Sequence, residues 1–413
     1  MRGWWAIALA TAAYFVAVTQ RTSMGVASLQ ASERFHTTAA QLSSLAVLQL
    51  VVYAGMQVPV GIWLDRWGPR KLISIGAIIM ATGQLTVALS PALSLAALGR
   101  MLVGMGDAFT FISMIRLANN WLEGKRAALT QQWLATLGQT GQIASAIPFA
   151  FLLHTSGWLA AFSALAAIGV MVAALSFIGI WDTPTVRSNT QPRKERVFES
   201  IKSSLRDRAV PLGFWTHFST QSSGTTFALL WGVPFMVGGN DLTVTDAATL
   251  LSLFVAVNAV AGVAIGWTVA QYPGIRRTLV RVIVSLIILV WVAVLAHEGP
   301  IGYAWMTAIV VVIAIGGPAS MIAFDFSRSY VRKENLGISN GIINVGGFLA
   351  CFIMIFLIGA TLDWQQNMDG QALFSTKHFR FSMATQLIVL SVGLFFFERS
   401  ANRHAKTLNQ GNK

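Results

Sequence analysis

Twelve long apolar stretches occupy most of this 413-residue chain, and they decide what it can fold into. A helix that crosses a bilayer needs about 20 mainly apolar residues, because only helices and closed barrels satisfy their own backbone groups in hydrocarbon. The predicted spans are 4–26, 40–63, 71–91, 95–118, 128–153, 158–181, 211–238, 247–270, 279–297, 300–325, 337–361 and 379–398. We therefore predict an all-α membrane protein with twelve transmembrane helices.

The composition fits this class and excludes others. Hydrophobic residues make up 55% of the chain and charged residues only 11%, whereas about 25% of a soluble domain is charged. A cytosolic enzyme is excluded, and we expect no enzymatic activity. The single cysteine, Cys351, excludes an intrachain disulfide and a zinc cluster built on cysteines. The first span contains Tyr14 and Arg21, which do not suit a cleaved signal peptide, so we expect this span to be retained.

The basic residues predict the orientation. An even number of spans places both termini on one side, and Lys and Arg are enriched in cytoplasmic loops. Of the 29 Lys and Arg residues, 24 fall on the side of the termini, four fall on the other side, and Arg100 lies within a span. We predict cytoplasmic termini and a location in the cytoplasmic membrane, among its lipids. Because the positive charge is spread over every inner loop, the net charge of +13 does not indicate a nucleic-acid partner.

The chain divides into two predicted halves of six spans each. Residues 182–210 contain two prolines, seven basic and four acidic residues, and read as a cytoplasmic linker. The expected domains are therefore an N-terminal bundle over 1–181, a C-terminal bundle over 211–398 and a cytoplasmic tail over 399–413. An internal repeat supports two equivalent halves, because the turn after Gly61 recurs 205 residues later, after Gly266, with an aromatic residue, a Gly/Pro turn and a basic pair.

Two motifs resemble those of the major facilitator superfamily. The run Gln57-Val-Pro-Val-Gly-Ile-Trp-Leu-Asp-Arg-Trp-Gly-Pro-Arg-Lys71 resembles the family's Gly-x-x-x-Asp-Arg-x-Gly-Arg-Lys signature between its second and third helices. The run Arg100-Met-Leu-Val-Gly-Met-Gly-Asp-Ala108 resembles the Arg-x-x-x-Gly-x-Gly motif of its fourth helix. Pro69 departs from the pattern, because the family more often has a basic residue there. The resemblance covers essentially the whole chain and implies two six-helix bundles that transport a solute by alternating access.

The resemblance also implies an inner gate. Its expected members are Gly61, Asp65, Arg66, Gly68 and Arg70, with Asp65 meeting the N-terminus of the eleventh helix in the other half. A carboxylate favours such a contact because a helix N-terminus carries a partial positive charge. The alternative is that these residues form a solvated turn whose basic residues only set the orientation.

Two ionisable residues share one face of the fourth span. Arg100 and Asp107 are seven residues apart, which brings them within about 20° on a helix and separates them by about 10 Å along its axis. That distance is too long for a direct bond but suits a polar stripe along a cavity. Ionisable groups inside a membrane are costly and usually functional, so we predict that Asp107, with Arg100, loads and releases a proton. The alternative is that Asp107 only bonds to neighbouring helices.

Tyr14 and Arg21 repeat this spacing in the first span. The run Arg21-Thr-Ser-Met-Gly-Val-Ala27 resembles the Arg-x-Asn-Leu-Ser-Val-Ala segment of the organic anion:cation symporter branch, with Ser23 in place of Asn. This resemblance implies that Arg21 binds an anion, since a guanidinium can grip a carboxylate or phosphate with two hydrogen bonds. The alternative is that Arg21, near the outer interface, reaches toward lipid headgroups.

Four uncharged or weakly basic side chains complete the predicted solute path. They are Gln142 in the fifth span, His217 and Gln221 in the seventh, and Asn344 in the eleventh. His217 is also a second candidate for the proton, because histidine changes charge near neutral pH. Gly316-Gly317-Pro318 predicts a bend in the tenth span.

The sequence contains no phosphate-binding loop, so energy is expected from an ion gradient rather than from ATP. We expect no cofactor and no metal. The hypothesis is proton-coupled uptake of a small polar or anionic solute by a monomer. The alternatives are a drug or metabolite exporter, for which the fifth span lacks the typical Gly-x-x-x-Gly-Pro-x-x-Gly-Gly motif, and a membrane sensor of the same fold that transports nothing.

Overall fold

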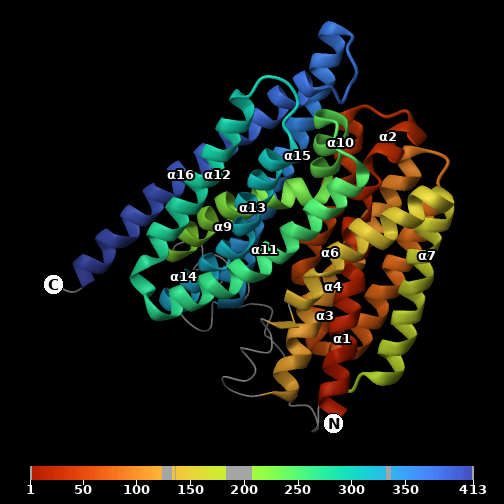
Figure 1. Cartoon of the computed structure of the whole chain (residues 1–413). Coiled ribbons are helices and arrows are strands. Elements are labelled where there is room, and N and C mark those ends of the chain that lie inside the picture. Colours follow the sequence, from red (N-terminus) through yellow and green to blue (C-terminus); the bar gives the residue numbers. More distant parts are fainter. Residues whose placement is uncertain (1, 123–132, 135, 183–206, 332–335, 412–413) are drawn as a thin grey trace. The chain divides into compact units, whose positions relative to one another are not determined.

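The computed structural model describes residues 2–122, 133–134, 136–182, 207–331 and 336–411. The chain forms two compact units (Figure 1). The first, unit 1, comprises residues 1–189 and 247–255, and the second, unit 2, comprises 190–246 and 256–413. Most of the predicted linker, residues 183–206, lies outside the described residues.

Unit 1 consists of helices, and its two longest helices are each broken by a glycine. Its elements are α1 (Arg2–Val26), α2 (Ser28–Phe35), α3 (Ala39–Leu89), α4 (Leu93–Trp121), α6 (Gly141–Ala144), the π-helix η1 (Ser145–Phe149) and α7 (Ala150–Gly179). Gly68 interrupts α3 and Gly157 interrupts α7, each with φ of 77°. Only glycine adopts this backbone region at little cost. Each break falls between two predicted spans.

Unit 2 is built around α9. Its elements are α9 (Ala209–Thr226), η2 (Phe227–Trp231), α10 (Gly232–Asn240), α11 (Val244–Gln271) except for its residues 247–255, η3 (Pro273–Ile275), α12 (Arg276–Ala296), α13 (Tyr303–Ala319), α14 (Ile322–Tyr330), α15 (Leu336–Asp369) and α16 (Thr376–Gly411). Helix α9 contacts α13, α14, α15 and α16. The tenth predicted span is interrupted directly after Pro318, as expected, since α13 ends at Ala319 and α14 begins at Ile322.

The twelve predicted helices are confirmed. Ten helical segments are long and apolar enough to cross a membrane, and one of these, Thr136–Gly179, contains two spans separated by Gly157. The remaining span is the continuous segment of α9, η2 and α10. Its many hydroxyl groups lower its hydropathy, but most of them are buried. Three of them, on Thr216, Ser219 and Thr220, donate to carbonyl oxygens of the preceding turn, as in Thr220 Oγ1 to Thr216 O at 2.7 Å.

The structure adds elements that the sequence did not suggest. Helix α2 follows α1 directly and ends at His36, whose φ is 48°. Helix α15 continues eight residues beyond the predicted end at 361, to Asp369. Residues 399–411, expected to be a tail, continue α16 as helix.

Glycines bring the second half of α3 onto α4. A Cβ atom added to Gly83 would lie 2.6 Å from the carbonyl oxygen of Gly99, and one added to Gly99 would lie 2.7 Å from that of Gly83. Gly76 and Gly106 form an equivalent pair at a second point along the same two helices, because a Cβ atom added to either glycine would collide with the carbonyl oxygen of the other. Small residues at these positions let the two backbones touch. This packing fixes the position of Asp107, which follows Gly106.

Candidate solute and proton site

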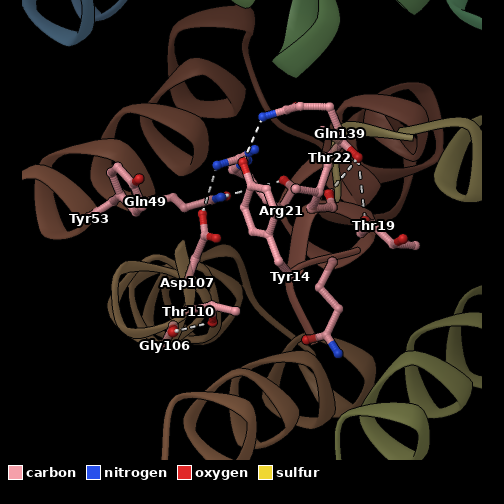
Figure 2. A network of polar contacts seen from close by, with 12 residues as sticks. Tyr14, Thr19, Arg21, Thr22, Gln49, Tyr53, Gly106, Asp107, Thr110 and Gln139 are labelled. Atoms are coloured by element: carbon pink, nitrogen blue, oxygen red, sulfur yellow. Dashed lines mark hydrogen bonds and ion pairs between the residues drawn. The ribbon is translucent and has the colours of Figure 1, made fainter. Parts of the chain in front are cut away.

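Arg21 of α1 and Asp107 of α4 form an ion pair in the interior of unit 1. Arg21 NH1 donates to Asp107 Oδ2 at 3.2 Å, and Figure 2 shows the carboxylate turned toward the guanidinium. The Asp107 side chain is 1% exposed and that of Arg21 is 17% exposed. The other carboxylate oxygen, Oδ1, is buried without a hydrogen-bond partner. In this pair, the Arg21 guanidinium is partly accessible, and Asp107 Oδ1 is free to accept a hydrogen bond.

Arg100 is not the partner of Asp107. Its guanidinium donates to the carbonyl oxygens of Arg21 at 2.7 Å and of Gln20 at 3.4 Å, and also to Gln49 Oε1. Gln49 Nε2 in turn donates to Arg21 O at 3.4 Å. The sequence grouped Arg100 with Asp107 by helix periodicity. The structure places Arg100 against the backbone of α1, where it positions the turn that holds Arg21.

Gly104 makes this arrangement possible. A Cβ atom added to Gly104 would collide with the carbonyl oxygen of Gln49. The first half of α3 and α4 therefore approach closely at this point, and the Gln49 side chain reaches both Arg100 and the backbone of α1. The glycine of the predicted Arg-x-x-x-Gly motif thus acts by allowing this contact.

Tyr14 lies next to the pair and is held by two glutamines. Gln139 Nε2 donates to Tyr14 Oη at 2.7 Å, and Gln142 Nε2 donates to Gln139 Oε1 at 2.7 Å. Gly138 leaves room for the Tyr14 ring, because a Cβ atom there would collide with it. The predicted residues Tyr14 and Arg21 thus lie beside Asp107 (Figure 2), and the predicted Gln142 is linked to Tyr14 through Gln139. Gln139 was missed, although its spacing of three from Gln142 puts both on one side of the segment.

The predicted residues of unit 2 show a different environment. His217 is 2% exposed, its ring meets that of Phe324 edge to face at 5.3 Å, and its Nδ1 atom has no hydrogen-bond partner. Gly347 leaves room for this ring. Gln221 on α9 and Asn344 on α15 are half-buried. Within its own unit, His217 thus has no carboxylate neighbour among the described contacts.

The predicted gate is seen only in part. The side chain of Asp65 lies outside the described residues, and so do those of Leu336 and Gly337, where the eleventh helix was expected to begin and where α15 begins. Arg66 is exposed, and a Cβ atom added to Gly61 would meet nothing within 4 Å. Gly68, with φ of 77°, forms the turn.

A residue assigned to the linker supports that turn. Asp182 Oδ1 accepts a hydrogen bond from the backbone N–H of Arg70 at 2.6 Å, at the start of the second half of α3. The Arg70 guanidinium lies over the Phe177 ring, 4.6 Å from its centroid. A carboxylate at a helix start satisfies a free N–H group and favours the helix dipole. The end of α7 and the residues that follow it thus hold this turn within unit 1.

The described residues contain no group of three or more His, Cys, Asp or Glu side chains that could hold a metal ion. Cys351 is buried in α15, where Thr226 Oγ1 lies 3.5 Å from its sulfur atom.

Comparison with known proteins agrees with this architecture. The chain is similar to the probable sulfoacetate transporter SauU of Cupriavidus necator, at 22% identity over 42% of this chain and 41% of that protein. It is also similar to the probable L-galactonate transporter of Escherichia coli, at 24% identity over 39% and 36%. The matched region thus spans about two fifths of the length of these curated relatives.

Solved structures share the fold over the whole chain. A bacterial homolog of the human lysosomal transporter Spinster superposes with a TM-score of 0.78, covering 98% of both chains at 16% identity. The family model of the Major Facilitator Superfamily matches residues 10–355. With its two bundles of six helices, the chain belongs to the major facilitator superfamily of membrane transporters.

Proposed function

We propose that this transporter takes up a small anionic solute together with protons across the cytoplasmic membrane. The observation that carries the proposal is the Arg21–Asp107 pair, in which a partly accessible guanidinium is bound to a buried carboxylate with one free oxygen. The proposal keeps both termini in the cytoplasm, as the distribution of basic residues predicts.

The pair offers a direct way to couple the two ligands. An anion that binds Arg21 competes with Asp107 for the guanidinium. The charged form of a buried carboxylate is unfavourable in free energy once its cation is lost, and protonation of Asp107 is therefore favoured. Binding of the anion and protonation of Asp107 therefore favour each other, and by linkage the coupling is reciprocal.

The neighbouring groups suit a polar solute. Gln142 and Gln139 offer amide groups beside Tyr14 and Arg21, and Gln142 remains half-buried. Gln221, Asn344 and His217 are the proposed solute groups of unit 2, and His217 is a second proposed proton site. The gate of Gly61, Asp65, Arg66, Gly68 and Arg70 is proposed to close the inner end, with Asp182 fixing its turn.

The curated relatives support an anion. Sulfoacetate and L-galactonate, named for two of them, are both anions at neutral pH, and a further relative is the nitrate/nitrite transporter NrtP of Nostoc punctiforme. A guanidinium as the accessible charge is consistent with all three classes, namely sulfonate, carboxylate and nitrate.

A thermal-shift screen of the purified protein tests this proposal. The panel contains small carboxylates, sulfonates and nitrate, with neutral sugars and lipophilic cations as controls, each at pH 5.5 and pH 7.5. A ligand that binds only the folded state raises the melting temperature. We expect an anion to do so, and more strongly at pH 5.5, because a protonated Asp107 leaves Arg21 free. Stabilisation by lipophilic cations alone would contradict the proposal and favour an exporter.

A further inference from the structure

A second ionic cluster lies at the turn between α15 and α16, at the end of α16 opposite to the C-terminus (Figure 1). The His378 side chain is completely buried there. Its Nε2 atom lies 2.9 Å from Asp369 Oδ1, and its Nδ1 atom lies 3.4 Å from the carbonyl oxygen of Leu373. This histidine is outside the network of Arg21 and Asp107 and is not part of the proposed solute path.

Both ring nitrogens of His378 face oxygen atoms that can only accept hydrogen bonds. A neutral imidazole has one N–H donor and one bare nitrogen, whereas the imidazolium has two donors. A neutral His378 would therefore turn one lone pair toward either Asp369 or Leu373. Only the protonated ring satisfies both contacts, and the Asp369 carboxylate compensates its charge.

The other charged groups at this end are accounted for. Asp369 Oδ2 accepts from Lys377 Nζ at 2.8 Å, and Oδ1 also accepts from the backbone N–H of Gln371 at 3.1 Å. Arg380 points away, since it donates to the carbonyl oxygens of Leu295 and Ala296. Among the described residues, the other charged or titratable side chains near this end are Asp363, which lies on another face of α15, and the exposed Asp241, His297, Glu298 and Tyr303 on neighbouring turns.

The cluster holds a turn that is docked on α10. A Cβ atom added to Gly238 would lie 2.9 Å from Phe374 Cβ, and one added to Gly239 would lie 2.6 Å from the Phe379 ring. The Phe379 ring also lies 5.7 Å from that of Phe235. Phe374 lies between Asp369 and His378 in the sequence, and Phe379 directly follows His378, so the cluster spans the same turn that packs on α10.

We infer that His378 and Asp369 form a proton-binding site that locks the α15–α16 turn onto α10. The proton completes the two hydrogen bonds of the ring. The docking is therefore strongest when the ring carries the proton, and it weakens when the ring loses the proton. With the termini in the cytoplasm, as proposed above, this site lies at the outer end of unit 2, and acidity outside the cell strengthens the docking.

Hydrogen exchange of the full-length protein in lipid nanodiscs tests this inference, with rates at pH 5.5 and pH 8.0 corrected for intrinsic exchange. Loss of a hydrogen bond to a charged group shifts a local opening equilibrium by about tenfold. We therefore expect the amides of residues 373–379 to be about tenfold better protected at pH 5.5 in the wild-type protein. Equal protection at the two pH values would overturn the inference without any variant.

Two variants assign the effect to this histidine. His378→Gln should make the protection of the turn independent of pH. His404→Gln is the matched control, because His404 lies near the other end of α16, against Tyr330, and should keep the wild-type pH dependence. A pH dependence that persists in His378→Gln would refute the assignment, and if that variant does not fold, Asp369→Asn provides the same comparison. The readout needs no transport, so it stays independent of the proposed solute.

Discussion

Asp107→Asn is expected to abolish accumulation of solute driven by a proton gradient, while the protein still inserts and folds. Asparagine has nearly the same shape but cannot take up or release a proton at the free Oδ1 position. Removing a group that transfers a proton typically lowers a rate by about 10²–10⁴-fold, so accumulation should fall by at least about 100-fold. Uptake into proteoliposomes with an imposed pH gradient measures this loss.

Exchange of solute across the same vesicles provides the control. Exchange moves no net proton, so Asp107→Asn should retain it, which distinguishes loss of coupling from loss of folding. Asp246→Asn is a matched variant, because Asp246 is a half-buried carboxylate that caps the first turn of α11, outside the site, and its uptake should resemble that of the wild type. Proton-coupled accumulation at wild-type rates in Asp107→Asn would refute the role of this residue.

Arg21→Gln is expected to weaken anion binding by roughly 10- to 100-fold. The estimate follows from a hydrogen bond between charged groups, which contributes about 1.5–3 kcal/mol, since each 1.4 kcal/mol is tenfold in affinity. The change also leaves Asp107 buried without its cation, and breaking a buried pair from one side typically costs about 3–5 kcal/mol of stability. Calorimetric or thermal-shift titration with the anion found in the screen measures both effects.

Two further variants separate binding from stability. The double variant Arg21→Gln/Asp107→Asn removes both charges and should regain much of the stability, but not the affinity. Arg34→Gln is the matched control, because Arg34 donates to Ser90 O and lies 5.6 Å from the Trp158 ring, outside the site. An anion affinity unchanged by Arg21→Gln would show that another group binds the solute.

The sequence predicted the fold well because its signals are local. The length of each apolar stretch matches the thickness of a membrane, and glycines such as Gly68 and Gly157 mark the places where a helix must break. Element ends were less predictable. Helix α15 continues to Asp369 because its last residues are fixed by contacts with α16, such as Gln365 Nε2 to Ser382 Oγ at 3.0 Å, and no local pattern encodes these.

The candidate site was predicted as a set of residues but not as a set of bonds. Helix periodicity places residues such as Arg100 and Asp107 on a face of their own helix. It does not show that Arg21, 86 residues earlier, lies closer to Asp107 than Arg100 does. His378 was overlooked for a related reason, because it lies in the first turn of α16 while its partner Asp369 ends the preceding helix.

Simultaneous measurement of solute and proton movement by the wild-type protein tests the central claim most directly. Proteoliposomes with an alkaline interior and an internal pH indicator are given the anion that stabilises the protein in the thermal-shift screen. The account predicts that the anion accumulates above its external concentration, that protons enter with it, and that a protonophore abolishes accumulation. Equilibration of the anion without accumulation or proton entry, or absence of any flux, would contradict the account.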